Sequence, residues 1–218
     1  MKDNKRFIAS FILNILVFLL VLIGTIVMIT VRSEELASNN ISVFKYFTFQ
    51  SNIFMGFVAL IYAYYQYLVI RGKNEKIPQN MGIFNLIATS AVALTFVIVI
   101  AFLAPGYGFN KMYKNANLFF HLLVPVVAIV NYLFSTKSDK YHFPLTLLTI
   151  IPSFLYGVVY FIVVAALNGY GDLKIDFYMF GKDGPLIGAF NFLAVMSIAY
   201  ALALLLYFLN RLVFKKSK

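Results

Sequence analysis

Two short stretches of this chain combine residue types that can do chemistry together. His121 is the only residue within the apolar stretches that can ionise near neutral pH, and it lies in the run Phe-Phe-His-Leu-Leu-Val-Pro. A polar run from Thr48 to Asn52 opens an earlier apolar stretch. A histidine can serve as a general base, and a threonine hydroxyl beside it can then act as a nucleophile in acyl transfer. This chemistry requires the two side chains to meet, so it depends on the elements that hold them.

Those elements are predicted to be membrane-spanning helices. The chain has 218 residues, of which 62% are hydrophobic and 12% charged, and its mean hydropathy is +0.86. Such a composition is typical of a membrane protein and excludes an ordinary soluble globule. Six segments are long enough to cross about 30 Å of hydrocarbon, and the first is expected to be a retained span rather than a signal peptide. We therefore predict one all-α, six-helix transmembrane domain over residues 1–218, with spans at about 7–31, 47–70, 81–104, 115–134, 143–167 and 188–210.

The distribution of Lys and Arg predicts how the bundle is oriented. Twelve of the 18 basic residues lie at the two termini and in the loops 71–80 and 135–142, whereas six lie on the other side. The positive-inside rule then places both termini in the cytoplasm of a multi-pass protein of the cell membrane. Because topology accounts for the net charge of +10, we do not expect a nucleic-acid partner. Membrane lipids are the expected environment.

The polar run in the second span has the spacing of one helical face. Thr48, Ser51, Asn52 and Met55 follow the pattern i, i+3, i+4, i+7, and a polar face within lipid must turn into the bundle. The first backbone N–H groups of that helix have no intrahelical acceptor and could stabilise an oxyanion, with Asn52 as a further donor. The alternative is that Thr48 simply caps the helix.

The fourth and fifth spans supply further inward candidates. Asn117 and His121 lie one turn apart, and Pro125 deprives the His121 carbonyl of its helical partner, which favours a kink. The alternative for His121 is a hydrogen bond between helices without any catalytic role. Tyr156 and Tyr160 share a polar stripe of the fifth span. For the group that orients the imidazole, the candidates are Asn117, Tyr156 and Asp176 of the loop before the sixth span.

Several other classes of site are not expected. The chain has no Cys, which removes thiol catalysis and iron–sulfur ligation. The second histidine, His142, is predicted on the opposite side of the membrane from His121, so a two-histidine haem site is not expected. A zinc enzyme typically needs three protein ligands, and neither Gly-x-Ser-x-Gly nor a phosphate-binding glycine loop occurs. We expect no metal, haem or other cofactor.

The two motifs together resemble a known family. Lys-Tyr-Phe-Thr-Phe-Gln-Ser-Asn, residues 45–52, and Phe-Phe-His-x-x-x-Pro around His121 are similar to the androgen-induced membrane hydrolase family and its bacterial relatives. The likeness covers the whole six-span plan. It implies an intramembrane hydrolase of fatty acid esters of hydroxy fatty acids, with Thr48 as nucleophile and His121 as its histidine partner.

We therefore expect an integral membrane hydrolase whose substrate is a lipid ester. In this hypothesis His121 takes the proton of Thr48, and Ser51, Asn52, Asn117, Tyr156, Tyr160 and Asp176 support the site or bind the substrate. Two alternatives from other classes stay open. One is a small transporter or channel with a polar site in the outer leaflet, although no span carries Asp, Glu, Lys or Arg. The other is a non-enzymatic protein that binds lipid or a partner helix.

Overall fold

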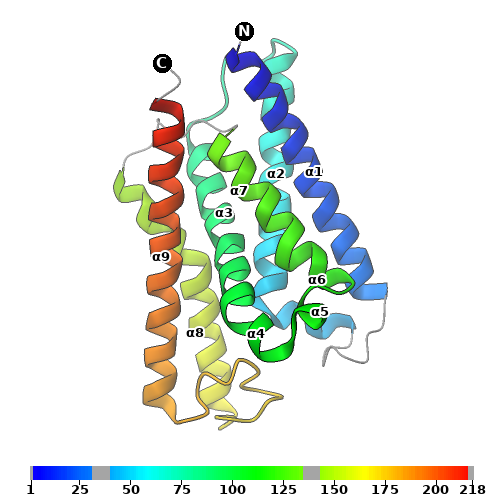
Figure 1. The fold of residues 1–218 in the computed structure, drawn as a ribbon. Helices are drawn as coiled ribbons and strands as arrows, with labels where there is room; N and C mark the ends of the chain where they lie inside the picture. Colours follow the sequence, from blue (N-terminus) through cyan, green and yellow to red (C-terminus); the bar gives the residue numbers. More distant parts are fainter. Residues whose placement is uncertain (1, 31–39, 135–142, 216–218) are drawn as a thin grey trace.

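The computed structural model describes residues 2–30, 40–134 and 143–215, and all their regular structure is helical (Figure 1). The first half contains α1 (Lys2–Thr30), the 3₁₀ helix η1 (Asn40–Lys45), α2 (Phe47–Ile70), α3 (Asn80–Ile98), the π-helix η2 (Val99–Leu103), α4 (Ala104–Tyr107) and α5 (Phe109–Met112). The second half contains α6 (Ala116–Leu118), the π-helix η3 (Phe119–Leu123), α7 (Val124–Phe134), the 3₁₀ helix η4 (Phe143–Ile150), α8 (Ile151–Ala166) and α9 (Pro185–Lys215).

Six helical segments are long and apolar enough to cross a membrane, as the sequence predicts. They cover 5–30, 47–70, 80–107, 116–134, 143–166 and 185–214, within a few residues of the predicted spans. The helices run side by side, and both chain termini lie at the same end of the bundle (Figure 1). The short helices α4, α5 and α6 and the loop before α9 lie at the other end (Figure 1).

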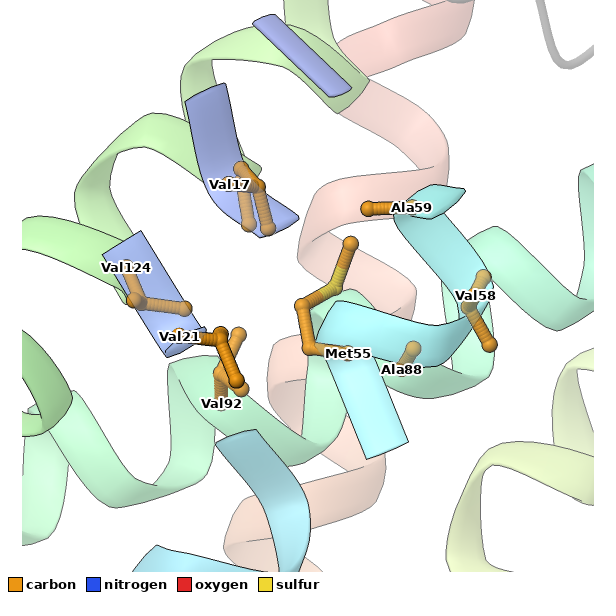
Figure 2. Packing of buried hydrophobic residues seen from close by; sticks show 9 residues of the cluster. Val17, Val21, Met55, Val58, Ala59, Ala88, Val92 and Val124 are labelled. Atoms are coloured by element: carbon orange, nitrogen blue, oxygen red, sulfur yellow. The ribbon is translucent and has the colours of Figure 1, made fainter. Parts of the chain in front are cut away.

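The tightest packing lies among α1, α2, α3 and α7. Small and β-branched side chains meet there around Met55, which is fully buried. Figure 2 shows this cluster, which consists of Val17, Val21, Met55, Val58, Ala59, Ala88, Val92, Val124 and Ala128. Gly56 lets the first two helices approach closely, because a Cβ at this position would lie 2.9 Å from Val21 Cγ1. Thr48 lies at the start of one of these four helices, and η3, which contains His121, leads directly into another.

The outer surface of the bundle is strongly apolar. Large hydrophobic side chains are exposed along the helices, including Phe57 of α2, Val159 of α8 and Phe190 of α9. Water would disfavour so much exposed apolar surface, whereas hydrocarbon does not. The exposure pattern is thus the one expected of helices that face lipid.

Two of the spans change to π-helical winding near the end that carries α4, α5 and α6. Val99–Leu103 in the third span precedes Pro105, and Phe119–Leu123 in the fourth precedes Pro125. A proline has no N–H to give to the carbonyl one turn before it, so the regular ladder is broken there. In the fourth span the Val124 N–H reaches back to the Phe119 carbonyl. The distortion predicted at Pro125 is therefore a π-turn, and it contains His121.

A buried amide network joins three helices in the half of the bundle nearer the termini. Asn14 Nδ2 donates to Gln66 Oε1 over 2.9 Å, and Asn131 Nδ2 donates to Asn14 Oδ1 over 2.9 Å. All three side chains are at most 1% exposed. Polar groups without access to water must pair with one another, so this network fixes the rotation of α1, α2 and α7 about their axes. Sequence analysis did not single out these residues.

Replacing Asn14 should destabilise the bundle, because it is the central member of this network. An Asn14→Leu variant leaves Gln66 Oε1 and Asn131 Nδ2 without their partner. We expect a loss of about 1 kcal/mol, the size of an interhelical hydrogen bond in a membrane protein. Unfolding in mixed micelles, followed by circular dichroism, measures this loss. Ser197→Ala is the control, since its exposed hydroxyl only donates to the Leu193 carbonyl of its own helix. Equal stability of both variants would contradict the role of the network.

Candidate active site

Thr48 and His121 line the same cavity, although 73 positions separate them in the chain. This cavity, called here the histidine cavity, has a volume of about 280 Å³. It lies at the end of the bundle away from the termini, among α2, η3, the turns α4 and α5, and the loop before α9. Its other walls include Met28, Val43, Tyr46, Phe49, Leu103, Tyr107, Lys111, Met112, Asn117, Phe120, Phe177, Tyr178 and Met179.

A backbone carbonyl orients the imidazole of His121. Nδ1 lies 2.7 Å from the Met112 carbonyl oxygen, and a carbonyl can only accept, so Nδ1 carries the proton in this contact. In the neutral ring, Nε2 is then unprotonated and available as a base. The ring is only 8% exposed. None of the three side chains considered from sequence makes this contact, and a carbonyl has no sequence signature by which it could have been chosen.

Thr48 is not the cap of its helix. The residue at the N-cap position is Tyr46, without any side-chain capping bond, and Thr48 is the second residue of α2. The capping alternative is therefore wrong. Within the described part of the chain, neither the hydroxyl nor the N–H of Thr48 makes a hydrogen bond. Both groups are thus free to interact with a ligand in the cavity.

The other donors at the start of α2 are already engaged. The Phe47 N–H donates to the Tyr178 hydroxyl over 3.0 Å. The N–H groups of Phe49 and Gln50 both donate to the Tyr46 carbonyl, over 3.1 and 3.2 Å. The sequence suggested the first N–H groups of α2 as an oxyanion site. Among the first four of them, the N–H of Thr48 has no acceptor in the described structure, and it lies at the positive end of the helix dipole.

Asn52 connects the two segments that carry Thr48 and His121. Its Nδ2 donates to the Thr48 carbonyl over 2.7 Å and to the Phe120 carbonyl over 3.2 Å. Both amide hydrogens are used, so Asn52 has none left to donate to an oxyanion. Its Oδ1 is buried and has no partner among the described residues. Asn52 is fully buried and holds α2 against η3, which is a positioning role rather than the donor role considered from sequence.

Ser51, Asn117 and Tyr156 also make mainly structural contacts. The Ser51 hydroxyl lies 3.1 Å from the Thr48 carbonyl and 3.2 Å from the Thr95 hydroxyl, which ties α2 to α3. Asn117 lines the histidine cavity and donates to the Lys111 carbonyl over 3.2 Å. Tyr156 donates to the Lys45 carbonyl over 2.6 Å, just before α2 begins. These bonds hold the backbone on both sides of the two central residues.

Asp176 organises the loop that covers this end of the bundle. Its carboxylate is fully buried and accepts hydrogen bonds from the Tyr160 hydroxyl and from three backbone N–H groups. These belong to Gly171, Phe180 and Gly181, at 3.0, 3.0 and 2.9 Å. A carboxylate so fully used by the loop does not face the histidine cavity. Sequence analysis grouped Tyr160 and Asp176 with the site, and the structure pairs them with each other.

The loop held by Asp176 places two residues over the site. Tyr178 contacts the first N–H of α2, and removal from water raises the pKa of its hydroxyl to about 12, so the group stays protonated at neutral pH. Met179 has a φ of 56°, a left-handed conformation that is costly for a residue with a long side chain. Its N–H is held by the Asp176 carbonyl over 2.8 Å. Both Tyr178 and Met179 line the histidine cavity.

The chain matches no known family model, no curated protein and no solved structure. The functional argument therefore rests on the residues and on the geometry of the cavity. Across residues 2–30, 40–134 and 143–215, no three His, Cys, Asp or Glu side chains gather as metal ligands would. His142 lies outside these ranges.

Replacing Asp176 should loosen the loop without unfolding the bundle. In Asp176→Asn, an amide N–H₂ would face backbone N–H groups that need an acceptor, so part of the carboxylate network is lost. We expect faster amide hydrogen exchange at 171–181 and unchanged exchange in α2 and α3, measured by mass spectrometry. Asp172→Asn is the matched control, because exposed Asp172 accepts a bond from the Lys174 N–H. Exchange that rises equally in both variants would contradict this role.

Proposed function

We propose that this chain is an integral membrane hydrolase that cleaves fatty acyl esters, with Thr48 as nucleophile and His121 as general base. The observation that carries the proposal is the shared cavity. It contains a hydroxyl without a partner among the described residues and an imidazole whose Nε2 is left unprotonated by the bond to Met112. The resemblance to the androgen-induced membrane hydrolases gives the same two residues the same roles.

In the acylation step, Nε2 of His121 takes the hydroxyl proton while Thr48 Oγ forms a bond to the ester carbonyl carbon. The carbonyl oxygen becomes an oxyanion, which the free N–H of Thr48 and the helix dipole stabilise. The nucleophile's own N–H contributes to the oxyanion hole in serine-type acyl transfer as well. The carbon–oxygen bond to the alcohol then breaks, and the imidazolium returns its proton to the departing alkoxide. An acyl-threonine remains.

Deacylation repeats the same proton transfers with water. A water molecule gives a proton to Nε2 as its oxygen attacks the acyl carbon, and the bond to Thr48 Oγ breaks as His121 reprotonates it. The products are the free fatty acid and the regenerated hydroxyl. Asn52 supports both steps by holding the turn of Thr48 beside Phe120, because acyl transfer depends on the alignment of nucleophile and base.

The proposed location of the site is the outer leaflet of the cell membrane. Both termini lie at one end of the bundle, and the histidine cavity lies at the other end (Figure 1). The excess of Lys and Arg on the terminal side assigns that side to the cytoplasm. A membrane lipid ester could then reach the cavity sideways, without leaving the bilayer.

Removing the proposed nucleophile should abolish covalent labelling by a fluorophosphonate that carries an alkyl chain, and removing the proposed base should slow it. We expect Thr48→Ala to lose all labelling, and His121→Gln to label and to hydrolyse a long-chain nitrophenyl ester about 10²–10⁴-fold more slowly, the usual contribution of a general base. Thr48→Ser should keep activity. Thr25→Ala is the matched control, since that hydroxyl donates to the Val21 carbonyl within α1 and lines none of the described cavities.

Equal labelling of wild type, Thr48→Ala and His121→Gln would disprove the assignment. Solute flux into proteoliposomes that requires His121, without any released acid, would favour the transporter alternative. A Thr48→Ala variant that is altered only in stability would favour a non-enzymatic protein.

The proposed orientation can be tested with introduced cysteines, because the natural chain has none. Lys174→Cys and Lys73→Cys are a matched pair, as both replace an exposed lysine, at opposite ends of the bundle. On intact cells, a membrane-impermeant maleimide should label Lys174→Cys at once and Lys73→Cys only after permeabilisation. The reverse pattern would mean that the cavity faces the cytoplasm.

A further inference from the structure

Thr48 also lines a second cavity, which His121 does not reach. This cavity, called here the α9 cavity, has a volume of about 420 Å³ and lies among α2, α3, α8 and α9. Besides Thr48, the two cavities share Leu103, Tyr178 and Met179. Thr48 and these three residues therefore form the boundary between the two spaces.

The two cavities differ in chemical character. The histidine cavity has Lys111, Asn117 and His121 among its walls. The α9 cavity has no charged side chain among the described residues of its wall, and its apolar part includes Leu94, Ile98, Val195, Met196 and Ile198, beside the hydroxyls of Thr95 and Ser153. Along α9 the wall runs from Asn191 to Ile198, about 10 Å of helix axis at 1.5 Å per residue. A mainly apolar space of this length fits a hydrocarbon chain better than a charged group.

The chemistry of the proposed reaction decides which part of the ester lies on which side. The base that takes the proton of Thr48 must also return it to the departing alkoxide. The alcohol oxygen therefore faces His121 when the carbonyl carbon is at Thr48. The acyl chain leaves that carbon in another direction, and the α9 cavity is a second space, among those lined by described residues, that reaches Thr48.

We propose that the α9 cavity binds the acyl chain of the substrate, while the histidine cavity binds the alcohol portion and then the attacking water. The proposal rests on the hydrolase function proposed above and assigns its two binding sites. Phe102, which is 60% exposed, lies at the edge of the α9 cavity. The cavity thus reaches the lipid-facing surface, and an acyl chain can enter from the bilayer.

One aromatic ring limits the width of the α9 cavity. Phe192 of α9 lies directly on Gly157 of α8, where an added Cβ would come within 1.9 Å of the ring. The ring also contacts Phe161 edge-on, at a centroid distance of 5.6 Å. Phe192 is thus held in one place at the wall of the cavity, and the size of its side chain should affect which acyl chains fit.

The test compares two panels of esters, one varying the acyl chain from four to sixteen carbons and the other varying the alcohol. The larger side chain in Val195→Phe fills part of the α9 cavity. We expect kcat/KM for the esters with the longest acyl chains to fall at least tenfold relative to kcat/KM for the four-carbon ester, with the alcohol preference unchanged. Phe192→Ala should shift the preference towards longer or branched acyl chains. Met28→Trp, at the wall of the histidine cavity, is the matched control and should change the alcohol preference alone.

A change of alcohol preference in Val195→Phe, or an unchanged acyl preference in both α9-cavity variants, would overturn the assignment. A circular dichroism spectrum and an unfolding midpoint equal to those of wild type show that Val195→Phe is folded. A second measurement does not depend on catalysis: a fatty acid with a terminal diazirine is photo-crosslinked to Thr48→Ala protein. Crosslinks at 194–198 support the proposal, and crosslinks confined to α1 and η1 contradict it. If the wild-type protein hydrolyses no ester, the proposed function is disproved. The crosslinks then still show which cavity binds the fatty acid.

Discussion

Asn52 donates both hydrogens of its amide to backbone carbonyls, one of Thr48 in its own helix and one of Phe120 beside His121. In an apolar bundle such groups find no water, so each amide must be satisfied by another part of the protein. A proline-distorted helix leaves backbone groups unpaired, and η3 is such a segment. The bond from Asn52 to Phe120 therefore does two things at once. It uses a carbonyl of the π-turn, and it fixes the distance between the two helices that carry Thr48 and His121.

The same constraint explains the end of the bundle that covers the site. The loop before α9 brings peptide groups over an apolar interior, and the Asp176 carboxylate gathers three of their N–H groups together with the Tyr160 hydroxyl. This fold directs Tyr178 to the first N–H of α2, which leaves the next N–H, that of Thr48, free. The covering loop and the start of the helix therefore act as one unit. In the proposed mechanism, this free N–H is the donor that faces the oxyanion.

The bundle combines a close-packed core with several cavities. α1, α2, α3 and α7 share a close core of small side chains (Figure 2), which suits the proposed alignment of Thr48 with His121. Two cavities lie where α8 and α9 pack beside α2 and α3, and the histidine cavity lies at the end of the bundle away from the termini. The proposed hydrolase needs both properties, because close packing aligns the two side chains and a cavity gives an acyl chain room.

The sequence by itself determined the six spans, their limits to within a few residues, and the inward face of Ser51, Asn52 and Met55, because hydropathy and helical periodicity depend only on local residue types. It also indicated the distortion at Pro125. It did not identify Met112 as the partner of His121, Asn52 as a bridge, or the pairing of Tyr160 with Asp176, and it wrongly allowed Thr48 to be a cap. Those outcomes depend on backbone carbonyls and N–H groups, which every residue carries and no residue type reveals. Only the packing of distant segments decides which of them come within reach of a given side chain.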